Sequence, residues 1–171
     1  MNRLITAIDG LNEWVGRTVS WLTLGLVLLI GVDVLMRYLF KSSQVWVGEL
    51  EWHLFSLIFI LGAGYAFKHD RHVRVDLFYD RFSPKTKAWI NLLGTLFFLI
   101  PWCVFVMYAS SQFAWFSFLI GEGSDQPNGL PARYLIKGAI VLGFFLLLLQ
   151  GIAFLLRQVQ TIFSKNNQNK S

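Results

Sequence analysis

Residues 19–40 read VSWLTLGLVLLIGVDVLMRYLF, and this stretch decides what kind of protein the chain can form. It holds only two charged side chains, Asp33 and Arg37, and an apolar run of this length is typical of a helix that crosses a membrane. Three further blocks of the same character lie at about 46–67, 88–110 and 132–156. We therefore predict an all-α membrane protein with four transmembrane helices, forming a single domain over residues 1–171.

The composition of the whole chain agrees with this fold class. Hydrophobic residues make up 55% of the 171 residues and charged residues only 15%, whereas soluble domains carry about 25% charged residues. This balance excludes a disordered chain, which needs low hydrophobicity and high charge. The single cysteine, Cys103, excludes a disulfide framework and a cysteine-rich metal site.

The basic residues predict how the spans are oriented. With both termini in the cytoplasm, 11 Lys and Arg residues lie inside and four lie outside, and the opposite orientation would invert this. We predict the N-in and C-in arrangement, with the loop between the second and third spans in the cytoplasm. The formal net charge of +5 then reflects topology, so we expect no nucleic-acid partner.

The segment before the first span has the pattern of an amphipathic helix. Leu4, Ile8 and Leu11 recur at helical spacing, whereas Asp9 and Glu13 occupy other faces. Two structures fit this pattern: a helix that lies in the membrane interface, or a short amphipathic lead-in to the first span. The sequence favours neither over the other.

A second amphipathic segment is expected in the loop between the second and third spans. Val75 and Phe78 belong to an apolar stripe that is surrounded by basic side chains. This pattern predicts a short interfacial helix resting on the anionic head groups of membrane phospholipids. His72, Arg74 and Asp76, in the same loop, are candidate contacts with a partner subunit.

The third span has clear signals at its start and in its interior. Ser83 fits a helix N-cap, with Pro84 at the first helical position. Pro101 removes one backbone hydrogen bond and predicts a kink. After the span, residues 112–131 are expected to form a loop whose first half is an aromatic anchor, and Pro131 suits the start of the fourth span.

Asp33 and Arg37 are four residues apart and so share one face of the first span. A carboxylate at membrane depth can mark an ion or proton site. We favour a structural ion pair near the outer interface, because the middle of the second, third and fourth spans holds no ionisable side chain. A chain without such a path is a poor candidate for coupled transport on its own.

Four further candidates, Trp46, Glu49, Glu51 and His53, lie at the outer end of the second span. Glu49 and His53 share a helix face, but a metal site needs three or four ligands, so we expect no metal here. Arg37 lies across a short loop and is a candidate partner for Glu49, as is another subunit. Trp46 fits an aromatic belt at the membrane interface.

Small residues near the cytoplasmic end of the second span predict helix packing. Gly62 and Gly64 would let the backbone of another helix approach closely, as small residues do in lipid.

Nothing in the sequence predicts catalysis or a cofactor. It shows no phosphate-binding glycine loop and no nucleophile beside a base. A membrane cytochrome would need histidines that face each other inside the bundle, whereas the three histidines here lie at the ends of the second span or in a loop.

Five short motifs follow one another along the chain. They are Arg37 after the first span, Trp46…Glu49-Leu50, Gly62-Ala63-Gly64-Tyr65-Ala66, His72-Val73-Arg74-Val75-Asp76 and Gly129-Leu130-Pro131. In this order and spacing the set resembles the small membrane subunit, of the DctQ type, of tripartite ATP-independent periplasmic (TRAP) transporters. One departure is that Leu50 separates Glu49 from Glu51, whereas many members place two acidic residues side by side.

The resemblance implies a role and a set of partners. A subunit of this kind lies in the bacterial inner membrane and forms a heterodimer with a much larger TRAP membrane subunit, which carries the substrate and sodium sites. A periplasmic binding protein delivers the substrate, commonly an organic acid, by transient contact. The small subunit braces the fixed scaffold of this ion-gradient-driven importer. The candidate structural or subunit-interface residues are Asp33, Arg37, Trp46, Glu49, Glu51, His53, Gly62, Gly64, His72, Arg74 and Asp76.

A second class of function stays open from the residues alone. Four spans without a charged path also suit an independent membrane protein, either a small homo-oligomeric transporter or an electron-transfer membrane anchor.

Overall fold

The structure is a computed structural model that describes residues 2–69 and 82–168. Its elements are α1 (Asn2–Phe40), α2 (Val45–Lys68), α4 (Pro84–Gly94), the π-helical turn η1 (Thr95–Leu99), α5 (Ile100–Leu119) and α6 (Tyr134–Gln168). No strand occurs in the described part of the chain. Because α4, η1 and α5 run on from one another, four helical spans result, each long and apolar enough to cross a membrane. The predicted fold class is confirmed.

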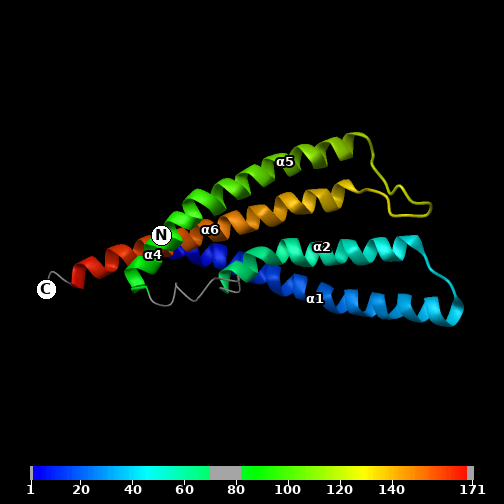
Figure 1. Ribbon diagram of the computed structural model, residues 1–171, viewed down its shortest axis with the longest axis horizontal. Coiled ribbons are helices and arrows are strands. Elements are labelled where there is room, and N and C mark those ends of the chain that lie inside the picture. Colours follow the sequence, from blue (N-terminus) through cyan, green and yellow to red (C-terminus); the bar gives the residue numbers. More distant parts are fainter. Residues whose placement is uncertain (1, 70–81, 169–171) are drawn as a thin grey trace.

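The four spans form an open layer and not a closed bundle (Figure 1). In order across the outer half of the layer they are α1, α2, α6 and α5, so that α2 packs between α1 and α6, and α6 packs between α2 and α5. At the inner end, α1 packs directly on α6. Asn2 and Gln168 lie at the same end of the layer, which we call the inner end. The α1–α2 connection and the loop of residues 120–133 lie at the opposite, outer end.

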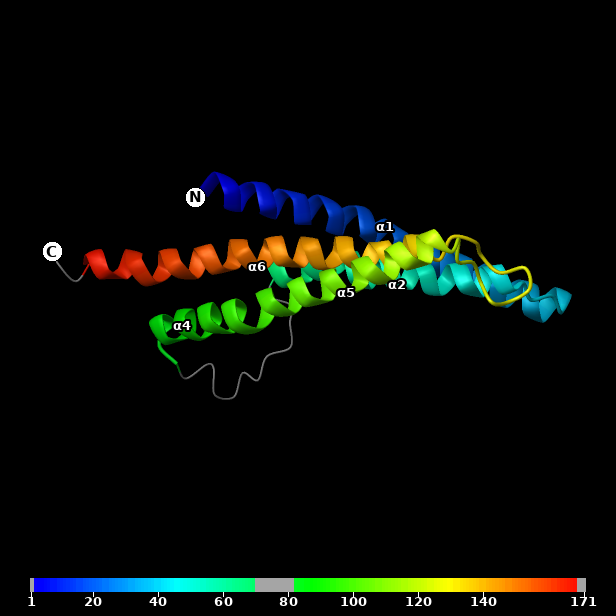
Figure 2. The same cartoon turned by 90° about the horizontal axis from the view of Figure 1, so that it is seen from above.

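α1 continues without a break from Asn2 to Phe40, as Figure 2 shows. At about 1.5 Å per residue its 39 residues are far longer than the ~30 Å hydrocarbon core. Of the two alternatives for the N-terminal segment, the structure therefore matches an amphipathic lead-in that is continuous with the first span, and not a separate helix in the membrane plane. The predicted apolar face of α1, which includes Ile5 and Ile8, is confirmed in part: Ile5 and Ile8 are buried, whereas Leu4 and Leu11 are exposed. Asn12, which the pattern places on another face, is buried beside them.

The buried stripe of α1 repeats every seven residues over most of the helix. Asn12, Val19, Leu26 and Asp33 are all buried. A strict seven-residue spacing is typical of helices that cross at a small, left-handed angle and stay in contact over a long distance. The stripe therefore explains how one long helix remains packed along α2.

Glycines set the closest approaches between the helices. A Cβ added to Gly16 would overlap the ring of Tyr65, and one added to Gly64 would overlap the side chain of Asn12. The predicted packing role of Gly64 is thus confirmed, and α1 is the helix that it meets. Gly62 has nothing within 4 Å of the added Cβ, so it makes no such contact with the part of the chain that the structure describes.

The third span differs from its prediction at two places. Its start is as expected, since the Ser83 hydroxyl accepts a hydrogen bond from the Thr86 amide at 3.2 Å. Just before Pro101, the helix contains a π-turn, in which the Ile100 amide donates to the Thr95 carbonyl. The predicted loop start at residue 112 is wrong, because α5 remains helical to Leu119. Aromatic side chains that can face lipid allow the helix to continue there.

Gly143 of α6 and Gly138, five residues earlier in the same helix, provide a test of this packing. A Cβ on Gly143 would overlap Ile60 of α2, including its backbone, whereas a Cβ on Gly138 would meet nothing within 4 Å. We expect Gly143→Ala to lower the free energy of unfolding by ~1–3 kcal/mol, because α2 must move away. Gly138→Ala should be neutral or slightly stabilising, since Ala is the better helix former. Unfolding in mixed micelles, followed by circular dichroism, measures both; equal effects would contradict the packing described.

Candidate functional site

Polar side chains gather at the two ends of the layer. The inner cluster consists of Asp9, Asn12 and Glu13 of α1, Lys68 and His69 at the end of α2, and Gln150 and Arg157 of α6. The outer cluster consists of Glu49 of α2, Glu122, Ser124 and Asp125 of the loop, and Arg133 and Lys137 at the start of α6. Each cluster joins at least two spans.

The inner cluster connects α1 to α6 through a buried chain of contacts. Asn12 is 1% exposed and Gln150 is 0% exposed, and the Asn12 amide donates to Gln150 Oε1 at 2.9 Å. Gln150 Nε2 in turn donates to Asp9 Oδ1 at 2.9 Å, and Arg157 pairs with the other oxygen of Asp9. Buried amides are costly unless bonded, so this pairing specifies which faces of the two helices meet.

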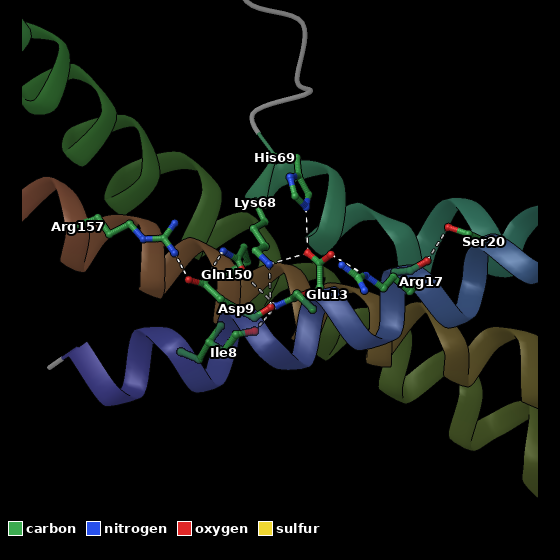
Figure 3. A network of polar contacts seen from close by, with 11 residues as sticks. Ile8, Asp9, Glu13, Arg17, Ser20, Lys68, His69, Gln150 and Arg157 are labelled. Carbon is green, nitrogen blue, oxygen red and sulfur yellow. Dashed lines mark hydrogen bonds and ion pairs between the residues drawn. The ribbon is translucent and has the colours of Figure 1, made fainter.

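The same cluster connects α1 to α2 through Glu13 (Figure 3). Lys68 Nζ lies 2.7 Å from the Glu13 carboxylate and 3.1 Å from the Asp9 carbonyl oxygen. His69 Nε2 lies 3.0 Å from the same carboxylate, and Arg17 lies 2.9 Å from it on the α1 side. One carboxylate therefore joins the inner halves of both helices.

The sequence pattern does not predict this cluster, because it places Asp9 and Glu13 on faces away from the apolar one. A signal was nevertheless present. Gln150 lies inside an otherwise apolar span, and a polar side chain at that depth faces other protein groups. Asp9, Asn12 and Glu13 recur at three- and four-residue spacing, which places them on neighbouring faces of one helix.

Gln150 and Gln160 of α6 allow a matched test of the inner cluster. Gln150→Leu would remove the shortest contact of the buried Asn12 amide and one of the two partners of the Asp9 carboxylate, so we expect a loss of ~1–3 kcal/mol in unfolding free energy. Gln160→Leu removes only an exposed contact with Asn2 and should change stability by less than ~0.5 kcal/mol. Unfolding in mixed micelles measures the difference, and similar values for the two variants would show that the buried chain contributes nothing specific.

The outer cluster is built around Glu49. Its carboxylate accepts hydrogen bonds from the Ser124 hydroxyl and, at 2.5 Å, from the Leu130 amide, and Arg133 lies 3.4 Å away. The predicted pairing of Glu49 with Arg37 is wrong. Arg37 instead binds Asp33 of its own helix at 2.6 Å, which confirms the predicted structural pair. The Leu130 amide, 81 residues from Glu49 in sequence, binds the Glu49 carboxylate, because the loop of residues 120–133 folds back over the start of α2.

The geometry of the loop explains two of the sequence motifs. A Cβ on Gly129 would overlap Ser124 and come within 2.8 Å of Glu49 Oε2. Only glycine therefore leaves room for the hydrogen bonds between Glu49 and the loop. The Ser124 amide donates to the Leu130 carbonyl at 3.0 Å, which closes the loop on itself. Glu49-Leu50 and Gly129-Leu130-Pro131, which are far apart in sequence, thus meet at one place.

Lys137 and Glu122 form the second contact of the outer cluster. The Lys137 ammonium binds the Glu122 carboxylate and lies 3.7 Å from the centre of the Phe113 ring. The ammonium group holds the pKa of Glu122 below its ordinary value of 4.5. This contact joins the loop, α5 and α6.

The depressed pKa predicts an acid-dependent stability. Because Glu122 has a lower pKa folded than unfolded, its contact stabilises the protein above pH 4.5 and is lost as the pH falls through the lowered value. We expect Glu122→Gln to be less stable than the parent at neutral pH, with the difference shrinking in acid. Asp125→Asn is the control, because that side chain is 85% exposed. Thermal unfolding in detergent from neutral to acidic pH measures both, and a constant difference for Glu122→Gln would contradict the assignment.

The remaining candidates lie apart from one another or outside the described residues. His53 Nδ1 lies 2.6 Å from the Glu49 carbonyl oxygen, and its ring is tilted against Trp52. One carboxylate oxygen of Glu51 is buried and has no hydrogen-bond partner among residues 2–69 and 82–168, and Trp46 is exposed. No group of three His, Cys, Asp or Glu side chains that could hold a metal occurs in the described ranges. The three candidates of the second loop, His72, Arg74 and Asp76, lie outside the described residues.

Residues 26–161 match the model of the DctQ component of tripartite ATP-independent periplasmic transporters. The chain belongs to this family. It is therefore a transport component and not an enzyme. With its four spans, it is a multi-pass protein of the inner membrane. As one part of a tripartite system, it works with a large TRAP membrane subunit and a substrate-binding protein.

Relatives agree with this assignment. A TRAP transporter small permease protein of Haemophilus influenzae is 26% identical over 137 residues, which cover 80% of each chain. The ectoine TRAP transporter small permease protein TeaB of Halomonas elongata is 28% identical over 152 residues, which cover 85% of this chain and 74% of TeaB. The sialic acid TRAP transporter permease protein SiaT of Haemophilus influenzae is 24% identical over 162 residues. That match covers 95% of this chain but 24% of SiaT.

Proposed function

We propose that this chain is the scaffold subunit of its transporter: it braces the large membrane subunit and carries no substrate site of its own. The observation that carries this proposal is the distribution of charge in the layer. Charged side chains lie at the inner and outer ends, and the stretches between them, such as residues 54–67 of α2 and 138–156 of α6, contain none. A chain that moves ions or organic anions by itself is expected to have ionisable groups at membrane depth.

The shape of the layer supports a bracing role. In the outer half, α5 packs along α6 at one edge and α1 along α2 at the other, so both broad faces of that half stay open in the described part of the chain. At the inner end, α1 and α4 each pack against α6 (Figure 2). Large apolar side chains such as Trp21, Phe59 and Phe98 are exposed on it. Lipid covers part of such a surface, and a second membrane protein can cover the rest.

The match with SiaT supports a stable one-to-one heterodimer. Nearly the whole of this chain corresponds to about a quarter of that permease, so in SiaT the matching segment shares one polypeptide with a much longer remainder. A covalent link of this kind suits two parts that stay together during transport.

The substrate and the driving force belong to the other components in this proposal. The names of the relatives mention sialic acid and ectoine, both of which carry a carboxylate, so an organic acid is the proposed cargo. The resemblance to the family supports a sodium gradient as the driving force. The distribution of Lys and Arg supports placing the inner end of the layer, and with it both termini, in the cytoplasm. His72, Arg74 and Asp76 of the second loop are proposed to contact a partner subunit.

Copurification with the large subunit tests the proposal. We expect a one-to-one complex, and Glu49→Ala should lower both its yield and substrate uptake several-fold, because the loop of residues 120–133 loses its anchor on α2. Arg37→Ala should weaken assembly less, since among the described residues Arg37 pairs only with Asp33 of its own helix and is 59% exposed.

Asp125→Asn is the matched control for this experiment, because Asp125 belongs to the same loop and is mostly exposed. Full assembly and uptake with both Glu49→Ala and Arg37→Ala would refute the role of these charges. Uptake by the pure chain in liposomes would refute the scaffold function itself.

A further inference from the structure

An apolar groove follows the contact between α2 and α6 along one broad face of the layer, and we call it the α2–α6 groove. Leu50, Leu57 and Leu61 line it from α2, and their spacing of seven and four residues places them on one side of that helix. Leu135 and Leu142 line it from α6, again seven residues apart. Two cavities of about 410 Å³ each follow one another along this groove.

Other parts of the chain bound the α2–α6 groove at both ends. Residues 130–132, which belong to the loop that Glu49 holds on α2, line its outer end. Trp14 of α1 lines its inner end, because α1 packs directly on α6 there (Figure 2). The groove therefore opens sideways, toward the surrounding membrane.

His53 places a hydrogen-bond acceptor in this apolar lining. Its Nδ1 lies 2.6 Å from the Glu49 carbonyl oxygen. A carbonyl oxygen can only accept, so Nδ1 is the donor, and Nε2 of the neutral ring is left as an acceptor. Nε2 has no hydrogen-bond partner among residues 2–69 and 82–168, and the side chain lines the outer part of the groove. The groove thus holds one acceptor that the described chain does not use.

The two broad faces of the layer differ in charge beside the contact of α2 with α6. The lining of the α2–α6 groove contains no Asp, Glu, Lys or Arg side chain. On the other face, Glu122, Arg133 and Lys137 line a trough, and each is already paired within the outer cluster. A transmembrane helix carries mostly apolar side chains, so the uncharged groove suits such a helix better than the trough does.

We propose that the α2–α6 groove receives one transmembrane helix of the large TRAP subunit, and that a donor on this helix binds His53 Nε2. The inference rests on the proposed scaffold function and states which face of the layer the large subunit covers. Side chains of one helix pack as ridges into the grooves of another. From Leu50 to Leu61, α2 rises about 16 Å, or roughly three turns, which is enough for contact along one side of a helix.

The unpaired acceptor distinguishes a helix from a lipid chain. An acyl chain can fill an apolar groove but has no donor, so His53 Nε2 would stay unpaired at a cost in free energy. Leu130 and Pro131 line the outer end, so apolar side chains and not head groups surround His53 from that direction. A side chain with an N–H or O–H group, such as Ser, Thr or Asn of the large subunit, supplies the missing donor.

The same arrangement connects the groove to the outer cluster. Glu49 binds Ser124 and the Leu130 amide and so fixes the part of the loop that lines the groove. Loss of this carboxylate would free one end of the groove as well as the loop. The expected effect of Glu49→Ala on assembly therefore follows from the shape of the docking face, without direct contact between Glu49 and the large subunit.

Copurification of the large subunit with groove variants tests the proposal. Leu135 is 67% exposed, so Leu135→Trp can be accommodated by this chain but blocks the groove. We expect it to lower the yield of the complex about tenfold or more, because a bulky side chain meets the incoming helix. Leu119→Trp is the matched control, since Leu119 is 63% exposed at the outer end of α5 and lies outside the groove. It should leave the yield unchanged.

Variants of His53 test the hydrogen bond separately. His53→Leu should weaken the complex about tenfold, the factor expected when a buried donor of the partner is left without its acceptor. His53→Gln keeps an acceptor and should lose less. Ser56→Ala is the control, because Ser56 is a polar residue of the same helix that lines the trough on the other face.

The outcomes separate this inference from the scaffold function on which it rests. Absence of a complex with the parent chain would refute both. A complex that forms equally well with Leu135→Trp and Leu119→Trp would overturn the groove as the docking face and leave the scaffold function standing. Equal effects of His53→Leu and Ser56→Ala would overturn the hydrogen bond to His53. Circular dichroism and elution volume establish that each variant remains folded.

Discussion

Lipid tails are as apolar as leucine, so apolar side chains gain little by leaving lipid for each other, and helices in a membrane associate through close packing and polar contacts. This constraint shapes the whole chain. The spans meet where glycine lets backbones approach, as at Gly16, Gly64 and Gly143, and where polar groups find partners on another helix. The buried pair of Asn12 and Gln150 holds α1 on α6, and Glu49 holds the outer loop on α2.

The two polar clusters lie at opposite ends of an apolar layer. This arrangement suits a protein that supports another subunit better than one that moves a solute. Each cluster joins several elements, so that the positions of the helix ends are restricted at both membrane surfaces. Between the clusters, residues 54–67 of α2 and 138–156 of α6 contain no charged side chain. Such a body can hold its shape while a partner against its faces moves, which is what the proposed scaffold role requires.

Much of the fold could be predicted from local patterns, whereas contacts between distant residues could not. Long apolar runs predicted the four spans, and Ser83 with Pro84 predicted a helix start that the structure confirms. The i,i+4 pair of Asp33 and Arg37 was also predictable, because both residues belong to one helix. The predicted partner of Glu49 is wrong, because Arg37 is near Glu49 in sequence whereas Arg133, its actual partner, is brought near only by the fold.

The sequence by itself determined that this chain spans a membrane four times and which family it resembles, because both follow from apolar length and from motifs in a fixed order. Only the tertiary structure decided that the spans form an open layer, that Asp9 and Glu13 bind α6 and α2, and that Glu49 meets the Gly129-Leu130 turn. The physical reason is one of distance along the chain. Hydropathy and helical periodicity act over a few turns, whereas these contacts join groups 55 to 141 residues apart.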